Sequence, residues 1–574
     1  MYSDQKMLKR VYYKALLPNM IAILGGTVNV FFDGIMVGQR MGELGIASIN
    51  QSLAVYLLLC TFGSLIAAGS SALSAQSMGD DRQQEARDYY SLALELAFLV
   101  GILVCFLGFI FCGRLARFLG TPDSAAMVEA YIRITMFGGV FKVLLYVPYF
   151  YLRLEGRVQK AAVSMTTMTV LNILLDYLFL FLFDLGIAGA AWASNIATAV
   201  ACVMCFYFIS ARDSNFHFHP VFIKWNMLSK TVRYGSPMAA NNLFSSLRLL
   251  SLNNIMSLAG GSTMVAVFAI TNNLNEFSIC IQNGVPQAGS AMMGIYNGEQ
   301  DTLSVKKLLK MQLEAGAVTS LIFGLLLVIF SPFIGPLFGS SQDVRWPVLC
   351  LAVGIVLATL NSVMCYYYYS TMQTGIADFI TITRGFGAAV GTAWLLRGTG
   401  EGIWLFYFLG EIVTLILWVA VCLIYSRIKQ GRANLFLLDE TALKEGKSIG
   451  FTVACDAAAI CEASEKIHEF CEVNSFDADQ TMTISLALEE LMVITADKSM
   501  DNQGTMDVRI LRLPDGGILR IRSEGRRYNP LENADESLEF LGVTMIMKMA
   551  KKNGVSEHVG AEHSDCIHLM TKAL

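Results

Sequence analysis

The chain has 574 residues, of which 55% are hydrophobic and only 15% charged, and its net charge is −4. A soluble protein carries roughly 25% charged residues, so this composition, with a mean hydropathy of +0.52, excludes an ordinary soluble globular protein. The small net charge indicates no particular class of partner, and we expect no nucleic acid to bind.

Apolar runs of roughly 20 residues, the length that crosses a bilayer, recur before about residue 428. We count about twelve and predict an all-α polytopic membrane protein with twelve transmembrane helices. Landmark residues recur at one offset of 219 positions: Pro18 and Pro237, Gly79 and Gly298, Gly120 and Gly339, Gly156 and Gly375. Duplicated bundles are typical of secondary transporters. We therefore expect two parallel six-helix repeats, at 1–215 and 216–432.

Basic residues in the loops predict the orientation of the chain. If the N-terminus is cytoplasmic, one side collects most of them: Lys6, Lys9, Arg10, Lys14, Arg153, Arg157, Lys160, Lys224, Lys230, Arg233, Lys306, Lys307, Lys310, Arg427, Lys429 and Arg432. The other side carries scattered charges only. We therefore expect a multi-pass protein of the plasma membrane with both termini in the cytoplasm.

Two pairs of polar residues stand out in the first repeat. Asn29 and Asp33 are four residues apart, as are Asn172 and Asp176, so each pair lies on one helix face. A carboxylate inside a span costs at least a few kcal/mol unless it is protonated, paired or solvated. Two such groups brought together would hold a cation or share a proton. The alternative is that Asp33 lies near a helix end and meets water.

Three segments of the first repeat resemble the multidrug and toxin extrusion (MATE) family. They are "NVFFDGIMVGQRMGELGIASIN", "SALSAQSMGDDRQQEA" and "LNILLDYLFLFLFDLGIAGAAWAS", and "GVPQAGSAMMGIYNGE" follows the same pattern in the second repeat. The resemblance implies that Asn29, Asp33, Asn172 and Asp176, with Ser194 as the matching hydroxyl, form a proton or sodium site. It implies no other cofactor and no enzymatic activity.

Pro18 lies within the first span and removes a backbone hydrogen bond. The resemblance implies that this helix bends when the site is protonated. Pro237 is its counterpart, for which a static kink is an equal alternative. In the second repeat, Glu276 is the candidate contact for a cationic organic substrate, and a salt bridge to Arg248 or Arg384 is the competing interpretation.

After residue 432 the chain becomes charged, and 433–574 is long enough for a small α/β sandwich domain in the cytoplasm. The pattern predicts a strand at 448–455, helices at 460–473 and 478–499, a hairpin that turns at 515–517, a helix near 543–554 and a terminal strand.

The order of these elements resembles the histidine-kinase-like ATPase fold of anti-sigma-factor kinases. The resemblance rests on "LALEEL", "SEGRRYNPLEN" and "EFLGVTMIMKMA". If Glu490 is the acid of the N-box, Ile494 replaces a magnesium-binding Asn, and an apolar side chain cannot ligate Mg²⁺. Ser523 replaces an adenine-reading Asp before Gly525, and the last glycine box keeps only Gly542. We therefore expect a tail that is ATPase-like in shape and non-catalytic, with no bound metal, and that either regulates the transporter or docks a cytoplasmic regulatory protein.

The sequence thus predicts a secondary antiporter, in contact with membrane lipids, that exports amphipathic, cationic small organic compounds in exchange for H⁺ or Na⁺. A flippase for lipid-linked substrates is one alternative, because both signs of charge occur in the spans. A membrane sensor that signals through the ATPase-like tail is the other.

Overall fold

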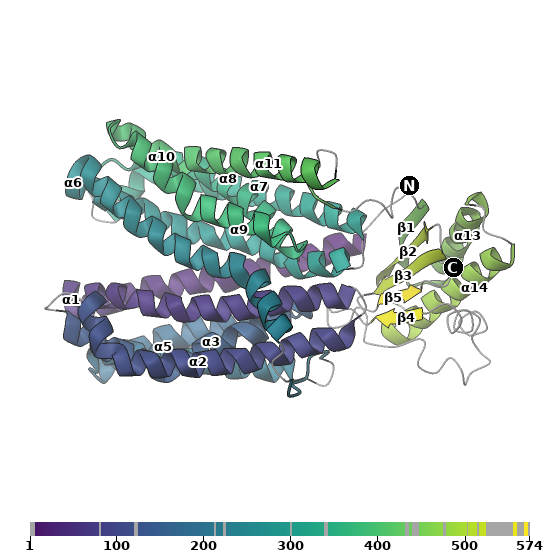
Figure 1. Cartoon of the computed structure of the whole chain (residues 1–574), viewed down its shortest axis with the longest axis horizontal. Coiled ribbons are helices and arrows are strands. Elements are labelled where there is room, and N and C mark those ends of the chain that lie inside the picture. The colour runs from purple at the N-terminus through teal and green to yellow at the C-terminus, as the bar shows by residue number, and fades with distance from the viewer. Residues whose placement is uncertain are drawn as a thin grey trace.

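The computed structural model describes residues 6–79, 82–119, 124–211, 214–221, 225–298, 301–337, 342–430, 435–438, 447–474, 478–501, 503–513, 516–523, 555–558 and 568–571. Figure 1 shows a long bundle of helices with a smaller unit of strands and helices at one end. We call the end of the bundle that holds Gly79 and Gly298 the tail end, because it adjoins this unit, and the opposite end the far end.

The helices of the bundle fall into two sets. The first set is α1 (Lys6–Gly79), α2 (Gln83–Leu119), α3 (Ala125–Leu154), α4 (Val158–Tyr177) and α5 (Gly186–Ile209). The second set is α6 (Trp225–Gly298), α7 (Thr302–Leu337), α8 (Arg345–Ser370), α9 (Thr374–Ile382), α10 (Ala388–Leu396) and α11 (Phe406–Gln430). Helix α6 begins and ends 219 residues after α1, so the offset read from the sequence is also the offset of this pair of helices. After α3 and α8 the structural offset is 216, because the turns at 155–157 and 371–373 form the same backbone hydrogen bonds. Gly156 therefore corresponds to Met372 and not, as the sequence predicted, to Gly375. We call the first set the N-lobe and the second set the C-lobe.

Helices α1 and α6 each reverse direction within their length. In α1, Arg10 Nη2 donates to Thr505 Oγ1 of the strand unit at 3.4 Å, and Gly79 at the other end packs against Gly298. Both ends of α1 therefore lie at the tail end, whereas 74 residues of straight helix would extend about 110 Å. Helix α6 is broken at Gly260 and Gly261, where Gly261 has φ of 65°, a conformation that glycine adopts without strain.

Ten helices of the described residues are long and apolar enough to cross a membrane. They include one segment of α1, Val55–Gly79, and one segment of α6, Thr263–Gly298. The fold is therefore that of a multi-pass membrane protein. The sequence predicted twelve spans, whereas ten helices of the described residues meet this criterion of length and apolarity.

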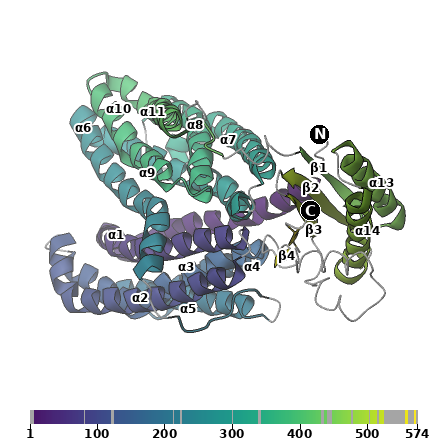
Figure 2. The same cartoon turned by 45° about the vertical axis from the view of Figure 1, so that its right-hand side comes forward.

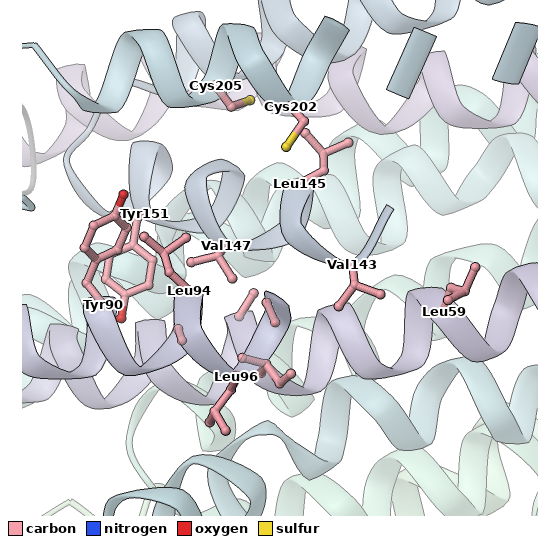
Figure 3. Close-up of a cluster of buried hydrophobic side chains, with 14 of the residues drawn as sticks. Leu59, Tyr90, Leu94, Leu96, Val143, Leu145, Val147, Tyr151, Cys202 and Cys205 are labelled. Atoms are coloured by element: carbon pink, nitrogen blue, oxygen red, sulfur yellow. The ribbon is translucent and has the colours of Figure 1, made fainter. Parts of the chain in front are cut away.

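Each lobe has its own apolar core. In the N-lobe, buried side chains of α1, α2, α3 and α5 form one cluster, part of which is drawn in Figure 3. Tyr90 of α2 and Tyr151 of α3 meet edge to face there, with ring centroids 4.8 Å apart. Ser74 of α1 hydrogen-bonds the Tyr151 hydroxyl at 2.8 Å, so the buried phenol is satisfied. The C-lobe core joins α6, α7, α8 and α11, and the first turns of α1 pack into it.

The two lobes meet through backbone-to-backbone contact between α1 and α6. A Cβ atom on Gly69 would overlap the carbonyl of Thr231 and the backbone nitrogen of Gly235, and one on Gly235 would overlap the carbonyl of Leu65. Elsewhere on α1, Asn19 Nδ2 donates to the Gly284 carbonyl at 2.7 Å. Glycine is thus required where the lobes cross, because any side chain would push the helices apart.

The C-terminal unit contains a five-stranded antiparallel sheet in the order β1-β2-β3-β5-β4. Its strands are β1 (Lys447–Ala454), β2 (Thr505–Leu513), β3 (Gly516–Ser523), β4 (Val555–His558) and β5 (His568–Thr571), and its helices are α13 (Ala457–Val473) and α14 (Ala478–Ile494). Figure 2 shows both helices beside one face of the sheet, where their apolar side chains form a shared core with β1, β2 and β3. The predicted hairpin is confirmed by the pairing of β2 with β3. The helix predicted near 543–554 lies outside the described residues.

Replacing Gly69 by valine tests the close crossing of the lobes. The new side chain must displace the backbone of α6, and overpacking of this kind costs about 1–3 kcal/mol. We expect Gly69→Val to lower the melting temperature of the purified protein in detergent by several degrees. Gly26→Val is the matched control, because a Cβ on Gly26 meets no atom within 4 Å. Equal melting temperatures for the two variants would contradict the close crossing.

Candidate functional site

The N-lobe places the two predicted carboxylates together. Asn29 and Asp33 lie one turn apart on α1, and Asn172 and Asp176 lie one turn apart on α4. Asp33 and Asp176 interact electrostatically with each other. Asp176 is 1% exposed, and a π-helical turn, Leu178–Leu182, begins two residues after it. Such turns are frequent at functional sites.

The Asp33 and Asp176 side chains lie within hydrogen-bonding reach of each other, but most acceptor oxygens of these four side chains receive no hydrogen bond from any other described residue. The buried oxygens without a hydrogen bond among the described residues are Asn29 Oδ1, Asp33 Oδ1, Asn172 Oδ1, Asp176 Oδ1 and Asp176 Oδ2. Leaving a buried polar atom unpaired costs about 1–3 kcal/mol. A cluster of such oxygens from two helices can bind a proton or a hard cation, because hard cations take oxygen ligands.

Ser194 of α5 reaches this cluster through a lysine. Lys142 of α3, 4% exposed, lies with its Nζ 3.5 Å from Ser194 Oγ and interacts electrostatically with Asp33. Its ammonium also lies over the Tyr56 ring, 5.4 Å from the ring centroid. The sequence showed Lys142 as a charge within a span but gave no reason to place it beside Asp33.

Tyr131 of α3 is a second residue that the sequence did not assign to the site. It interacts electrostatically with both Asp33 and Asp176. Nothing in the sequence pattern around Tyr131 distinguishes it from the other aromatic residues of the spans, so only the packing of α3 against α1 and α4 reveals it.

The charge of the cluster depends on the protonation of its carboxyl groups. With both carboxylates ionised and Lys142 charged, the site carries an excess of one negative charge, which is costly inside a bilayer. Binding of a proton or of Na⁺ would remove that excess. The described residues contain no group of three or more His, Cys, Asp and Glu side chains that could hold a metal ion, so Na⁺ would depend on the asparagine oxygens as well.

Pro18 lies within α1, fifteen residues before Asp33, and the helix continues through it. The neighbouring Asn19 is anchored to α6 at Gly284. The static structure shows where a bend at Pro18 would act, namely on the segment that carries Asn29 and Asp33. The bend itself stays a prediction.

The C-lobe contains a second group of charges, in a different arrangement. Arg384 Nε donates to Glu411 at 3.0 and 3.3 Å, Nη1 donates to Ser362 Oγ at 2.7 Å, and Nη2 donates to Gln282. For Glu276 the sequence left two interpretations, a contact for a cationic substrate and a salt bridge to Arg248 or Arg384. Its carboxyl group interacts electrostatically with Arg248, while its backbone carbonyl accepts from Thr27 Oγ1 at 3.5 Å.

In the C-terminal unit, the residues of the predicted degenerate nucleotide site are only partly described. Ile494 is buried at the end of α14 and Ser523 is buried at the end of β3, while Glu490 lies one turn before Ile494. Gly525 and Gly542 lie outside the described residues. The structure therefore leaves the nucleotide site a prediction.

Comparison with known proteins identifies relatives of the bundle. The chain is 24% identical over 363 residues to the probable multidrug resistance protein YoeA of Bacillus subtilis (strain 168), across 61% of this chain and 76% of YoeA. It is 21% identical over 371 residues to the multidrug export protein MepA of Staphylococcus aureus (strain MSSA476), across 64% of this chain and 81% of MepA.

Solved structures share the fold. One is the outward-facing conformation of a multidrug resistance MATE family transporter of the MOP superfamily, with a TM-score of 0.69 and 21% identity over 75% of this chain and 99% of that one. The MatE family model matches residues 18–178 and 237–388, one segment in each lobe. Because these segments make up more than half of the sequence, the chain belongs to the MatE family, whose members are transporters rather than enzymes.

Proposed function

We propose that this protein is a secondary antiporter that exports amphipathic, cationic organic compounds in exchange for H⁺ or Na⁺. The observation that carries the proposal is the pair Asp33 and Asp176, which lie within hydrogen-bonding reach of each other and whose buried oxygens receive no hydrogen bond from the other described residues. Its relatives YoeA and MepA are named for multidrug resistance and export, which supports an organic substrate.

Ion entry would be coupled to export because the ion and the organic cation compete for the same negative charge. Entry of a proton or Na⁺ neutralises the carboxyl pair, which changes the packing of α1 against α4 and weakens the attraction of the N-lobe for an organic cation. Asn29, Asn172 and Ser194 complete the ion site, and Lys142 tunes its charge. Pro18 is the point at which α1 would bend, and Glu276 remains the proposed substrate contact in the C-lobe.

We propose twelve passes in all, because α1 and α6 reverse direction and so each crosses the membrane twice. The tail end would face the cytoplasm of a plasma-membrane protein. Support comes from the basic residues expected on that side, such as Arg153 and Arg157, which bind groups at the tail end: Arg153 Nη1 donates to Gln287 Oε1 at 2.9 Å, and Arg157 Nη1 donates to the Phe208 carbonyl at 2.8 Å.

We propose further that the C-terminal unit is a regulatory domain, ATPase-like in shape but non-catalytic. Its contact with the bundle is specific. Asp301, at the start of α7, is buried and forms ion pairs with Arg509 of β2 and with Arg522 of β3, the latter at 2.7 Å. The Arg522 guanidinium also lies over the Tyr296 ring, 4.2 Å from its centroid.

The buried ion pairs belong to the C-lobe side of this contact. The position 219 residues before Asp301 is occupied by Arg82, which pairs with Glu85 at 2.6 Å, and a basic residue there would repel Arg509 and Arg522. The N-lobe contacts the unit through Arg10, which donates to Thr505. A domain held by both lobes can sense or limit the movement of one lobe against the other.

A flippase for a lipid-linked substrate is the second candidate function. Three basic residues within the spans, Lys142, Arg248 and Arg384, favour it, because they would suit a phosphorylated headgroup. Transport of a dye under an ion gradient separates the two functions.

Asp33→Asn tests the coupling site. The variant cannot gain or lose a proton at position 33, so we expect gradient-driven efflux of a fluorescent cationic dye from proteoliposomes to fall to the background rate. Proton and sodium gradients are imposed separately, and the gradient that drives the wild type identifies the ion. Glu314→Gln, which removes an exposed acid of α7, is the control and should transport normally. Wild-type efflux by Asp33→Asn would refute the coupling role.

Asp301→Asn tests the regulatory contact. Removing the carboxylate leaves Arg522, which is 5% exposed, as a buried charge, and such a loss costs about 3–5 kcal/mol. We expect hydrogen exchange of residues 505–513 and 516–523 to accelerate by an order of magnitude or more, and the transport rate to change with it. Glu314→Gln again serves as the control. A loosened unit with an unchanged transport rate would argue against regulation through this contact.

A further inference from the structure

The duplication allows the two lobes to be compared position by position, and their polar groups have diverged. The position that corresponds to Asp33 in the C-lobe is Leu252, 219 residues later. The position that corresponds to Asp176 is Thr392, because the hydrogen-bonded turn before α4 recurs before α9 with an offset of 216. The position that corresponds to Asn29 is Arg248. The acidic site of the N-lobe is therefore absent from the C-lobe, and a guanidinium stands at the place of one of its amides.

Arg248 lines two adjoining cavities of the C-lobe. The larger encloses about 690 Å³ between the two halves of α6, α8 and the α9 region, and Arg384 also lines it. No Asp or Glu is among the described residues that line this larger cavity. The smaller cavity, of about 540 Å³, shares Arg248 and Arg384 and adds Glu411. The larger cavity is therefore lined by two cations and by neutral groups.

The two arginines differ in what binds them. Arg384 is held by Glu411, Ser362 and Gln282, and Glu411 is itself fixed by Asn361 Nδ2 at 2.8 Å. Among the described residues, Arg248 forms no hydrogen bond and no ion pair. It has longer-range electrostatic interactions with Glu276 and Glu411; Glu411 lines the smaller cavity and is already bound to Arg384, and Glu276 lines neither cavity.

Neutral polar side chains surround Arg248 on the cavity wall. Asn241 and Ser245 lie on the same face of α6 as Arg248, and Asn275 and Asn283 face them from the second half of that helix. A guanidinium with amide and hydroxyl donors beside it is the arrangement that binds carboxylates and phosphates, often through two parallel hydrogen bonds. A guanidinium left without such a partner inside a bilayer would be costly.

We propose that the cavity around Arg248 is a site for the anionic group, carboxylate or phosphate, of an amphipathic substrate. This inference rests on the proposed function and deepens it: the exported compounds carry an anionic group as well as a cationic one. The acidic N-lobe then responds to the cationic part of the substrate and to the coupling ion, and Arg248 in the C-lobe binds the anionic part.

The test compares two dyes that differ only at one group. Rhodamine 110 carries a free carboxylate and rhodamine 123 carries the methyl ester of the same carboxylate. Their dissociation constants are measured by fluorescence anisotropy with the full-length protein in neutral detergent, without any gradient. We expect the wild type to bind rhodamine 110 about tenfold more tightly or better, the range of one charge-assisted bidentate interaction.

Arg248→Gln should abolish this preference while it leaves the affinity for rhodamine 123 nearly unchanged, which also shows that the variant is folded. Arg397→Gln is the matched control, because Arg397 lies over Trp394 at the end of α10 and lines neither cavity. Equal affinities of the wild type for the two dyes would overturn the proposal, as would a preference that survives in Arg248→Gln.

Two further measurements identify the source of the anionic ligand and separate this proposal from the antiport function. Phosphatidic acid, titrated against a phosphatidylcholine control, should displace rhodamine 110 only when Arg248 is present if a lipid phosphate is the natural ligand. Without displacement, the ligand is a soluble anion. Asp33→Asn should keep the rhodamine 110 preference, because its defect is in coupling. A protein with the preference but without gradient-driven export would refute the antiport function and leave the anion site standing.

Discussion

The cost of a charged side chain in hydrocarbon governs this structure. The described ionisable groups of the two polar clusters are paired, partly neutralised or placed at a cavity, because an isolated charge costs at least a few kcal/mol inside the bundle. Arg384 and Glu411 satisfy one another at 3.0 Å, and such a pair can be static. Asp33 and Asp176 lie together with only Lys142 as a nearby cation among the described residues, so a bound proton or cation would balance the remaining negative charge. That imbalance is why we propose that the N-lobe site couples ion entry to export.

The two lobes share one backbone arrangement, but the polar side chains at corresponding positions differ. The first helix of each lobe keeps the same length and the same reversal, yet Asn29 and Asp33 in one correspond to Arg248 and Leu252 in the other. The same divergence placed Asp301 opposite the C-terminal unit and Arg82 at the matching position of the N-lobe. Because the repeats share their packing, a change of a few polar residues is enough to give the lobes the different roles that we propose, ion coupling in one and anion recognition in the other.

Much of the fold could be predicted from the sequence, because the length of an apolar run and the distance between repeated residues can be read along the chain without knowledge of the packing. The pairing of Asn29 with Asp33 and of Asn172 with Asp176 on two helix faces was visible for the same reason. The position of Lys142 beside Ser194 and the assignment of Glu411, rather than Glu276, to Arg384 were not visible. They depend on how separate helices rotate against one another, and helix periodicity in so apolar a chain does not fix that rotation. The break of α6 at Gly260 and Gly261 falls between two of the apolar runs counted in the sequence, and a Gly-Gly pair is a signal for a turn.

The most direct test of the central claim is the equilibrium affinity for a cationic dye as a function of pH and of Na⁺ concentration, measured in detergent for the wild type and for Asp33→Asn with Asp176→Asn. The account predicts that protonation or Na⁺ weakens dye binding in the wild type, because ion and dye compete for the same negative charge, and that the double variant shows no such dependence. The same dependence in both proteins would contradict the account.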